Sequence, residues 1–231
     1  MSPEPESFRY EKKVFLENFQ YVLLNYVVST SSFNFYKPYE SRWVNNIYFD
    51  DYNFSAFKDN IEGNRSRKKL RIRWYGEQLE NPNTKKLELK MKKGHVGAKE
   101  YFDLGNFYVG KKSNAKSIMT QLKNCDLEKK VLNSLSSMRP IISNRYQRDY
   151  YLSMNGRIRI TIDRDISFEN WFYPSGEKNK LLLDNTCILE IKFSKESLED
   201  AKRVFQTLGV RSTKSSKYVM AVDSLIAKGF I

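Results

Sequence analysis

The sequence predicts an α+β protein in which about eight antiparallel strands close into a β-barrel with helices packed outside. Three observations favour this fold. Extended segments follow one another mostly through short turns, which is typical of antiparallel pairing, and no βαβ alternation is evident. Six of these segments alternate charged and apolar residues, so that each has a charged face and an apolar face. Several amphipathic helices must bury an apolar stripe, and the apolar face of the sheet can cover it.

The first half of the chain alternates strand and helix patterns. Apolar residues with the spacing of one helix face predict a helix over 15–29; they are Phe15, Phe19, Val22, Leu23 and Tyr26. A short helix is predicted over 53–62, with Asn53 as N-cap and Gly63 at its end. Strands are predicted at 8–14, 43–50, 68–75, 86–92 and 98–104, with a turn at N-P-N 81–83.

The second half begins with a long helical pattern over 114–137, carried by Ile118, Leu122, Leu127, Val131 and Leu135. Pro140 lies shortly beyond the end of this pattern. The N-G pair at 155–156 is a strong hairpin signal. Further strands are predicted at 145–152, 157–166 and 187–193, and further helices at 195–208 and 215–228.

Composition narrows the function. The chain has 231 residues, a net charge of +13 and 40% hydrophobic residues, which predicts one folded domain over residues 1–231. The basic balance favours an anionic partner, such as nucleic acid, anionic lipid or a phosphate-rich small molecule. The motifs G-x-G-x-x-G and G-x-x-x-x-G-K-[ST] are absent, so Rossmann and P-loop nucleotide sites are not supported.

Cysteine usage and hydropathy predict the compartment. Cys125 and Cys187 lie far apart without a CxxC or Cys/His partner, so neither a disulfide framework nor a zinc site is expected. The acidic N-terminus differs from an ordinary signal peptide, and no apolar run approaches the roughly 18 residues of a membrane helix. We therefore expect a soluble, cytoplasmic protein with no transmembrane segment, unless the chain is a piece of a longer one.

The charged faces are rich in Arg and Lys. In K-K-L-R-I-R-W-Y-G, Lys69, Arg71 and Arg73 lie on the face opposite Leu70, Ile72 and Trp74. One such strand is typical of a half-solvated sheet, but six of them predict charged faces that line the interior of the barrel. The other members are Glu88, Lys90 and Lys92; Arg157, Arg159, Thr161 and Asp163; Glu190 and Lys192; Arg9, Glu11 and Lys13; Tyr146, Arg148 and Tyr150.

Such an interior requires an anionic ligand. At an effective dielectric of about 20, two like charges about 4 Å apart repel by about 4 kcal/mol, so unpaired cations in a tunnel would be costly. Arginine forks match phosphate oxygens, and lysines add point charges. The carboxylates would then hold a divalent cation that bridges the phosphates.

Eight short motifs, in this order and spacing, resemble the catalytic domain of the vacuolar transporter chaperone complex, a polyphosphate polymerase of the triphosphate tunnel metalloenzyme superfamily. They are R-Y-E-K-K (9–13), I-Y-F-D (47–50), L-R-I-R-W-Y-G (70–76), L-E-L-K (87–90), Y-Q-R (146–148), R-I-T-I-D (159–163), L-E-I-K (189–192) and S-K-Y (216–218). The resemblance covers residues 8–225 and implies the closed triphosphate tunnel. It also implies transfer of the ATP γ-phosphate to a growing polyphosphate chain with a divalent metal, Mn²⁺ or Mg²⁺.

The resemblance also implies roles for individual residues. Arg71 and Arg73 match paired arginines that grip the nucleotide phosphates, and Lys217 matches a lysine near the transferred phosphate. Glu190 matches the metal-binding glutamate. From the resemblance we class as catalytic the residues Lys217, Arg71, Arg73 and Arg159. We class as substrate-binding the residues Lys13, Lys90, Lys99, Tyr146 and Arg148.

Alternatives stay open beside the polymerase. One is a catalytically silent module that binds polyphosphate or another polyanion. Another is a triphosphate hydrolase of the same superfamily, although Arg9 replaces the first glutamate of the E-x-E-x-K motif common there. RNA binding ranks lowest because Trp74 lies on the face opposite the arginines. The expected partners are ATP and polyphosphate, not nucleic acid; a membrane-protein partner is compatible with the resemblance, and the sequence gives no oligomeric state.

For three further residues, a structural or solvent-exposed role is a possible interpretation of the sequence. Glu88 fits a salt-bridge partner as well as a metal ligand. Asp163 fits a structural role. His95 fits a solvated loop, because nothing in the sequence pairs it. Phosphoryl transfer depends mainly on positioning and charge stabilisation, so the lack of a Ser-His-Asp or Cys-His set is no obstacle.

Overall fold

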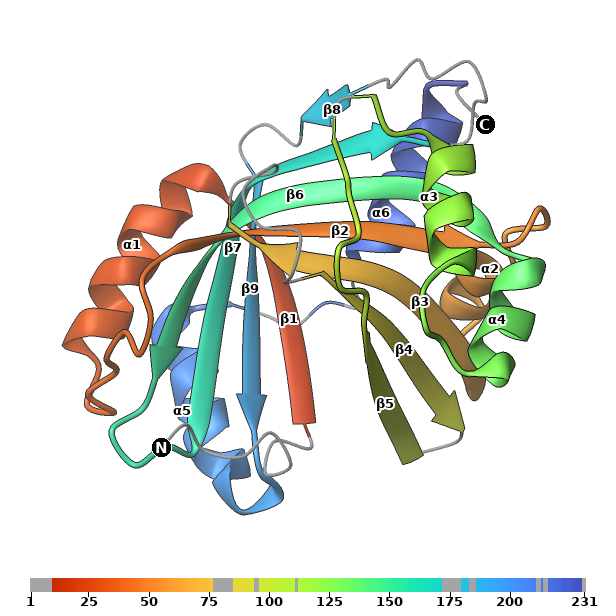
Figure 1. Cartoon of the computed structure of the whole chain (residues 1–231). Coiled ribbons are helices and arrows are strands. Elements are labelled where there is room, and N and C mark those ends of the chain that lie inside the picture. The colour runs from red at the N-terminus through yellow and green to blue at the C-terminus, as the bar shows by residue number, and fades with distance from the viewer. Residues whose placement is uncertain are drawn as a thin grey trace. The chain divides into compact units, whose positions relative to one another are not determined.

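The computed structural model describes residues 10–76, 85–93, 96–110, 112–171, 180–182, 186–210, 213 and 216–229. The fold is α+β (Figure 1). Its strands are β1 (Tyr10–Glu17), β2 (Arg42–Asp50), β3 (Ser66–Tyr75), β4 (Lys86–Lys93), β5 (Val96–Asp103), β6 (Arg139–Leu152), β7 (Ile158–Asn170), β8 (Lys180–Leu182) and β9 (Thr186–Phe193). Its helices are α1 (Asn18–Thr30), α2 (Ser55–Ile61), α3 (Ala115–Lys123), α4 (Lys129–Ser136), η3 (Lys195–Ser197), α5 (Leu198–Leu208) and α6 (Lys217–Ala227).

The chain forms two compact units. Unit 1 comprises Met1–Arg42, Tyr146–Ile166 and Leu182–Ser215. Unit 2 comprises Trp43–Arg145, Ser167–Leu181 and Ser216–Ile231, so that β6 and β7 each contribute residues to both units. That the chain is one domain over residues 1–231 stays a prediction.

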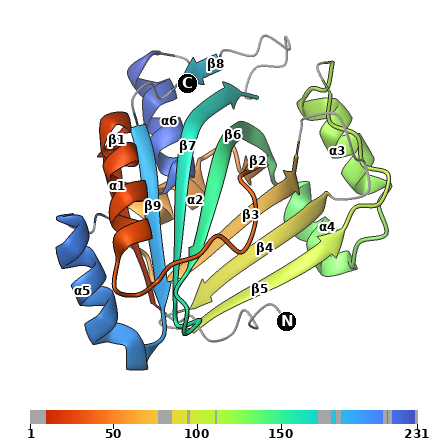
Figure 2. The ribbon, with the colours of Figure 1, turned by 90° about the vertical axis from the view of Figure 1, so that its left-hand side faces the viewer.

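Unit 1 is a sheet with helices on its apolar face. The antiparallel ladders β1–β9 and β7–β9 place Lys13 opposite Glu190, and Glu190 opposite Thr161. Apolar residues that alternate with these charges pack against α1 and α5, which lie side by side along β9 (Figure 2). This core includes Ile160, Leu189 and Ile191 of the sheet, Leu24 and Val28 of α1, and Ala201 and Val204 of α5.

The predicted apolar face of the first helix is wrong. β1 runs to Glu17, because Phe15 pairs with Ile188 of β9, and α1 begins only at Asn18. The helix then buries Leu24 and Val28, whereas Val22, Leu23 and Tyr26 are 71%, 61% and 67% exposed.

Unit 2 has the same two-layer arrangement. The ladders β2–β3, β3–β4 and β4–β5 are antiparallel, and the apolar residues of β3 and β4 pack under α3 and α4 (Figure 1). Fully buried contacts of this core are Leu70, Ile72 and Leu87 from the strands and Ile118, Leu122 and Val131 from the helices.

Two helix predictions in unit 2 need correction. The pattern over 114–137 is two helices: α3 ends at Lys123, α4 begins at Lys129, and Leu127 between them still enters the core. Asn53 is not the N-cap of α2, because Phe54 takes that position in the left-handed conformation. The carboxylate of Asp50 instead accepts from the amides of Ala56 and Phe57, at 2.9 and 3.1 Å.

The strands are confirmed, with longer bounds for β6 and β7. Pro140 lies shortly beyond the end of α4 at Ser136, as predicted, and it already belongs to β6; β7 continues to Asn170. The short strand β8 was not predicted. Within the described part of the chain, every helix is too short or too polar to cross a lipid bilayer. The N-P-N turn, Arg9 and His95 lie outside the described residues.

The predicted closure of the sheet into a barrel is wrong. Among the described residues, the hydrogen-bonded order is β1-β9-β7-β6-β2-β3-β4-β5, with β8 beside β7, and its two ends do not pair. The outer edge of β1 is partly occupied by Thr213, whose amide donates to the Lys13 carbonyl at 2.7 Å. The other edge strand, β5, carries exposed Lys99 and Asp103, and charges of this kind discourage further strand pairing.

Candidate functional site

The predicted site residues fall into two groups of five, one in each unit. Unit 2 holds Arg71, Arg73, Lys90, Lys99 and Lys217, and unit 1 holds Lys13, Tyr146, Arg148, Arg159 and Glu190. In each unit, the strand residues among them lie on the face of the sheet opposite the apolar core. Their convergence in one tunnel stays a prediction.

The group in unit 2 forms around two arginines of β3; we call Tyr48, Arg71, Arg73, Glu88 and Lys217 the arginine cluster. Glu88 of β4 lies opposite Arg71 in the ladder and accepts hydrogen bonds from its Nε and Nη2, at 2.8 and 2.5 Å. The second oxygen of Glu88 lies 3.7 Å from Nε of Arg73. Although burial opposes ionisation, these two arginines hold the pKa of Glu88 below its ordinary value. Glu88 is thus a salt-bridge partner, as one of the two readings of the sequence had it.

Arg73 differs from Arg71 in its hydrogen-bond partner, which is an amide rather than a carboxylate. Its Nε donates to Oδ1 of Asn46 at 2.8 Å, and its side chain is only 14% exposed. No described residue accepts a hydrogen bond from its two outer nitrogens. A guanidinium that is mostly buried but open at its fork is suited to an anion with two oxygens.

Tyr48 lies in the middle of the arginine cluster. It pairs with Arg71 across the β2–β3 ladder, and its ring stacks on Tyr218 of α6 at 5.5 Å. Tyr218 is held in turn by a 2.6 Å hydrogen bond to Asp50. Burial alone would raise the pKa of Tyr48, yet the charges of Arg71, Arg73 and Lys217 hold it below its ordinary value. The positive potential at this position is therefore strong enough to outweigh desolvation.

Lysines extend the positive surface along the next row of the sheet. Lys69, Lys90 and Lys99 are direct partners across the β3–β4 and β4–β5 ladders. Nζ of Lys69 donates to Ser216, the residue before Lys217, at 3.2 Å. Like charges directly opposite one another destabilise a sheet, so a bound polyanion would relieve this row.

The group in unit 1 is built on ion pairs; we call Glu11, Lys13, Arg148, Asp163, Glu190 and Lys192 the glutamate cluster. Nζ of Lys13 lies 2.6 Å from Glu11 and 3.5 Å from Glu190, and Nζ of Lys192 lies 3.5 Å from Glu11 and 2.9 Å from Glu190. Burial would raise the pKa of Glu190, but Lys13, Lys192 and Arg148 hold it well below its ordinary value. Glu190 is therefore a carboxylate rather than a neutral acid.

Arg148 is fixed by a buried carboxylate. Its Nε and Nη2 donate to the two oxygens of Asp163, at 2.5 and 2.7 Å, and Asp163 is fully buried. The guanidinium also lies 5.2 Å from the ring centre of Tyr146. Burial would lower the pKa of Arg148, but Asp163 above all raises it well above its ordinary value. The structural role considered for Asp163 fits this geometry. Arg159 lies in the neighbouring row, opposite Lys192.

The candidate ligands for a divalent metal are the carboxylates of Glu11 and Glu190. Within the described residues, no group of three or more His, Cys, Asp or Glu side chains is placed to hold an ion. Glu11 and Glu190 share both lysines. Burial and the charge of Glu190 oppose ionisation of Glu11, but Lys13 and Lys192 hold its pKa below its ordinary value. Magnesium is commonly held by one or two carboxylates together with waters and the phosphates of a substrate. The pair therefore fits a metal that binds together with a phosphate chain.

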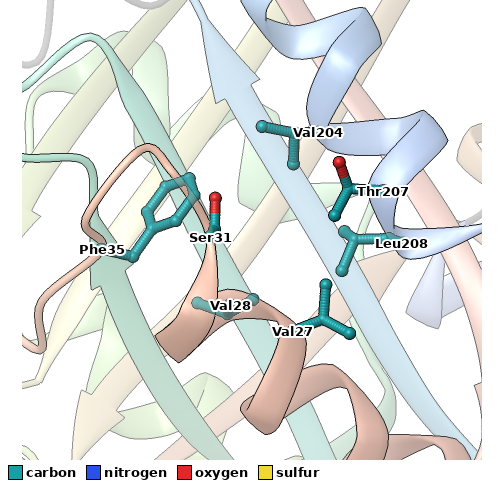
Figure 3. A pocket seen from close by; sticks show the side chains of 7 residues that line it. All are labelled: Val27, Val28, Ser31, Phe35, Val204, Thr207 and Leu208. Atoms are coloured by element: carbon teal, nitrogen blue, oxygen red, sulfur yellow. The ribbon is translucent and has the colours of Figure 1, made fainter.

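The hollows on the helix side are not part of this site. One is bounded by Val28 and Phe35 on one side and Val204 and Leu208 on the other (Figure 3). It has about 10 Å³ of space, enough for a single water molecule. Its apolar lining and its size exclude a phosphate ligand.

Sequence reasoning named Tyr146 but missed the other neutral residues of the site. Asn46 and Tyr48 alternate with Ile47 and Phe49 in β2, so the period-two pattern alone could have placed them on the charged face. Asn144 precedes Tyr146 by two residues and could have been found in the same way. Tyr218 carried no separate signal beyond its place in S-K-Y.

Comparison with solved structures agrees with the fold. Solved structures of similar fold include a candidate adenylate cyclase from Bacillus halodurans, with a TM-score of 0.54 and 13% identity over 91% of this chain and 94% of that one. Another is a candidate adenylate cyclase from Vibrio parahaemolyticus, with a TM-score of 0.50 and 11% identity over 90% of this chain and 95% of that one. A third is a candidate adenylyl cyclase from Hippeastrum with a dominant triphosphatase activity. Its TM-score is 0.50, at 14% identity over 93% of this chain and 95% of that one. No curated protein matches the chain.

The sequence itself gives the family. Residues 8–226 match the VTC domain, so the chain belongs to the VTC domain family. This confirms the resemblance to the vacuolar transporter chaperone domain that the sequence motifs indicated.

Proposed function

We propose that this protein is an ATP-dependent polyphosphate polymerase that transfers the γ-phosphate of ATP to the end of a polyphosphate chain. The observation that carries the proposal is the arginine cluster, in which Arg73 is mostly buried yet presents two open nitrogens. Membership of the VTC domain family supports the same substrate class. A reaction of this kind draws on ATP, which agrees with the cytoplasmic location expected from the sequence.

The arginine cluster is suited to the charge that develops in phosphoryl transfer. Arg73 and Lys217 would contact the transferred phosphate, and Arg71, fixed by Glu88, would support them. Pre-positioned cations in a half-buried site stabilise charge more strongly than mobile ones in water. The row Lys69, Lys90 and Lys99 would hold more distant phosphates of the chain.

The glutamate cluster is suited to phosphates together with a metal. Glu190 and Glu11 would hold Mn²⁺ or Mg²⁺, and the metal, when bound, would neutralise charge on the phosphate oxygens. Lys13 and Lys192 would then be released from these carboxylates and could contact the chain. Arg148, oriented by Asp163, and Arg159 would supply further contacts.

Two alternatives use the same residues. A triphosphate hydrolase would bind ATP and metal in the same manner but pass the phosphoryl group to water, and the triphosphatase activity of the Hippeastrum neighbour makes this the second candidate. A silent module would bind polyphosphate without turnover. The ion pair between Glu190 and two lysines favours a metal-dependent reaction, because simple polyanion binding gains nothing from a buried carboxylate.

One assay separates these functions. Purified protein is incubated with ATP and Mn²⁺, and ADP, inorganic phosphate and polyphosphate are measured together. The polymerase forms ADP and polyphosphate, the hydrolase forms ADP and inorganic phosphate, and the silent module forms neither but retains polyphosphate on a filter. Chelation of the metal should stop the reaction, and added Mn²⁺ should restore it.

Variants assign the reaction to the two clusters. Arg73→Ala and Glu190→Ala are each expected to lower the rate at least about 100-fold, in the range found when a charge-stabilising group is removed from an active site. Lys123→Ala removes a cation from the exposed end of α3 and should leave the rate within twofold. Full activity of either cluster variant would contradict the site.

A further inference from the structure

The inference concerns how Arg73 is held. Two asparagine side chains lie behind it in series. Nε of Arg73 donates to Oδ1 of Asn46, and Nδ2 of Asn46 donates to Oδ1 of Asn144, both at 2.8 Å. Asn46 is fully buried and Asn144 is 3% exposed. The first lies on β2 and the second on β6, so two strands support the orientation of one guanidinium.

The direction of these hydrogen bonds is fixed. Asn46 accepts with its oxygen and donates with its nitrogen, so a rotation of its amide by half a turn would break both bonds. The rotamer of Asn46 thus fixes the inner edge of Arg73 and leaves the outer two nitrogens as its remaining donors. Nδ2 of Asn144 is buried and has no partner among the described residues. Such a donor is unfavourable for stability, so the contribution of the pair to the fold does not by itself account for it.

The charge of the hydrogen-bond acceptor distinguishes Arg73 from Arg71 and Arg148. Arg71 donates twice to Glu88, and Arg148 donates to both oxygens of Asp163. Arg73 is backed by a neutral amide, and its nearest carboxylate oxygen, on Glu88, lies beyond hydrogen-bond distance at 3.7 Å. Two guanidinium groups and one carboxylate leave Arg71, Arg73 and Glu88 with a net charge of +1. Lys217 adds a further positive charge beside them.

We propose that Asn46 and Asn144 are positioning residues that orient Arg73 and, because they are neutral, leave its charge available to a phosphate group at its outer nitrogens. The inference rests on the proposed binding of phosphate at the arginine cluster. It predicts that the neutrality of position 46 matters as much as its hydrogen bond. A carboxylate at this position would still accept from Arg73, but it could no longer donate to Asn144. It would also bring the summed charge of position 46, Arg71, Arg73 and Glu88 from +1 to zero.

The test measures binding of inorganic tripolyphosphate by calorimetry without metal or ATP, so that it does not depend on turnover. Asn46→Asp, which has nearly the shape of the native residue, is expected to weaken binding at least tenfold. The double variant Asn46→Asp/Glu88→Gln returns the summed charge of these four positions to its native value of +1 and is expected to recover most of the affinity. A merely structural role for Asn46 would give no such recovery.

A second variant keeps the test decisive if Asn46→Asp folds poorly. Asn144→Leu removes the acceptor for Asn46 together with the unpartnered donor of Asn144, and it leaves Nδ2 of Asn46 unpartnered instead. One unpaired buried donor thus replaces another, so the unfolding midpoint should fall by no more than the loss of one hydrogen bond. Tripolyphosphate binding should nevertheless weaken at least threefold, because Asn46 is no longer held. Native affinity in both Asn46→Asp and Asn144→Leu would overturn the inference while leaving the proposed function intact. Failure of the wild-type protein to bind tripolyphosphate would overturn both.

Discussion

The buried pair Arg148–Asp163 gives a quantitative prediction for Asp163→Asn. The change keeps the size of the side chain but removes a carboxylate that is fully buried and bonded twice to Arg148, whose own side chain is 14% exposed. At an effective dielectric of about 20, two charges about 4 Å apart attract by about 4 kcal/mol. Breaking a buried pair by removing one partner typically costs about 3–5 kcal/mol, which agrees with that figure.

Urea unfolding followed by circular dichroism measures this loss. With a slope of about 3 kcal/mol per M, the expected loss lowers the midpoint by about 1–1.7 M. Asp165→Asn is the matched control, because Asp165 pairs with Arg164 at 2.7 Å but is 51% exposed. Its φ of 52° is one that asparagine tolerates, so the control should cost less than about 1 kcal/mol. Equal costs for the two variants would refute the argument from burial.

Two further predictions concern acid and the helical layer. The pKa of Glu190 lies well below its ordinary value of 4.5, so its contribution to stability is present above pH 4.5 and is lost as the pH falls through the folded value. Wild-type protein should therefore lose more stability between pH 7 and pH 3.5 than Glu190→Gln; parallel urea midpoints in the two proteins would contradict this. Leu122→Ala, at a fully buried position under α3, should cost about 2–5 kcal/mol, whereas Lys123→Ala should cost little. A small change at Leu122 would mean that α3 does not cover the sheet.

The strands and their charged faces could be predicted because the signal is local. In β3 every second residue enters the core, so Leu70, Ile72 and Trp74 alone define the face that carries Arg71 and Arg73. The same alternation of every second residue placed most members of the glutamate cluster on one face of their strands. No contact across the sheet was needed for either prediction.

The remaining features depend on contacts between distant residues. Phe15 looked helical because it shares the spacing of α1, yet its pairing with Ile188 extends the strand. Asn46 and Asn144 are 98 positions apart and uncharged, so nothing in the sequence joined them. Which carboxylate neutralises which cation was equally open. From the sequence, Glu88 could have formed a salt bridge with a nearby cation or held a metal. Only the register of β3 and β4 assigns it to Arg71.

The hydrogen bond from Tyr218 to Asp50 has a consequence for folding. It joins residues 168 positions apart, and the same carboxylate caps the start of α2. Contacts with such a large sequence separation close a long loop and form slowly. Tyr218 is adjacent to Lys217, so the lysine reaches its place beside Tyr48 only when α6 has docked. During synthesis, the β-strands around Arg71 can thus be complete while the proposed phosphate-binding site still lacks its lysine.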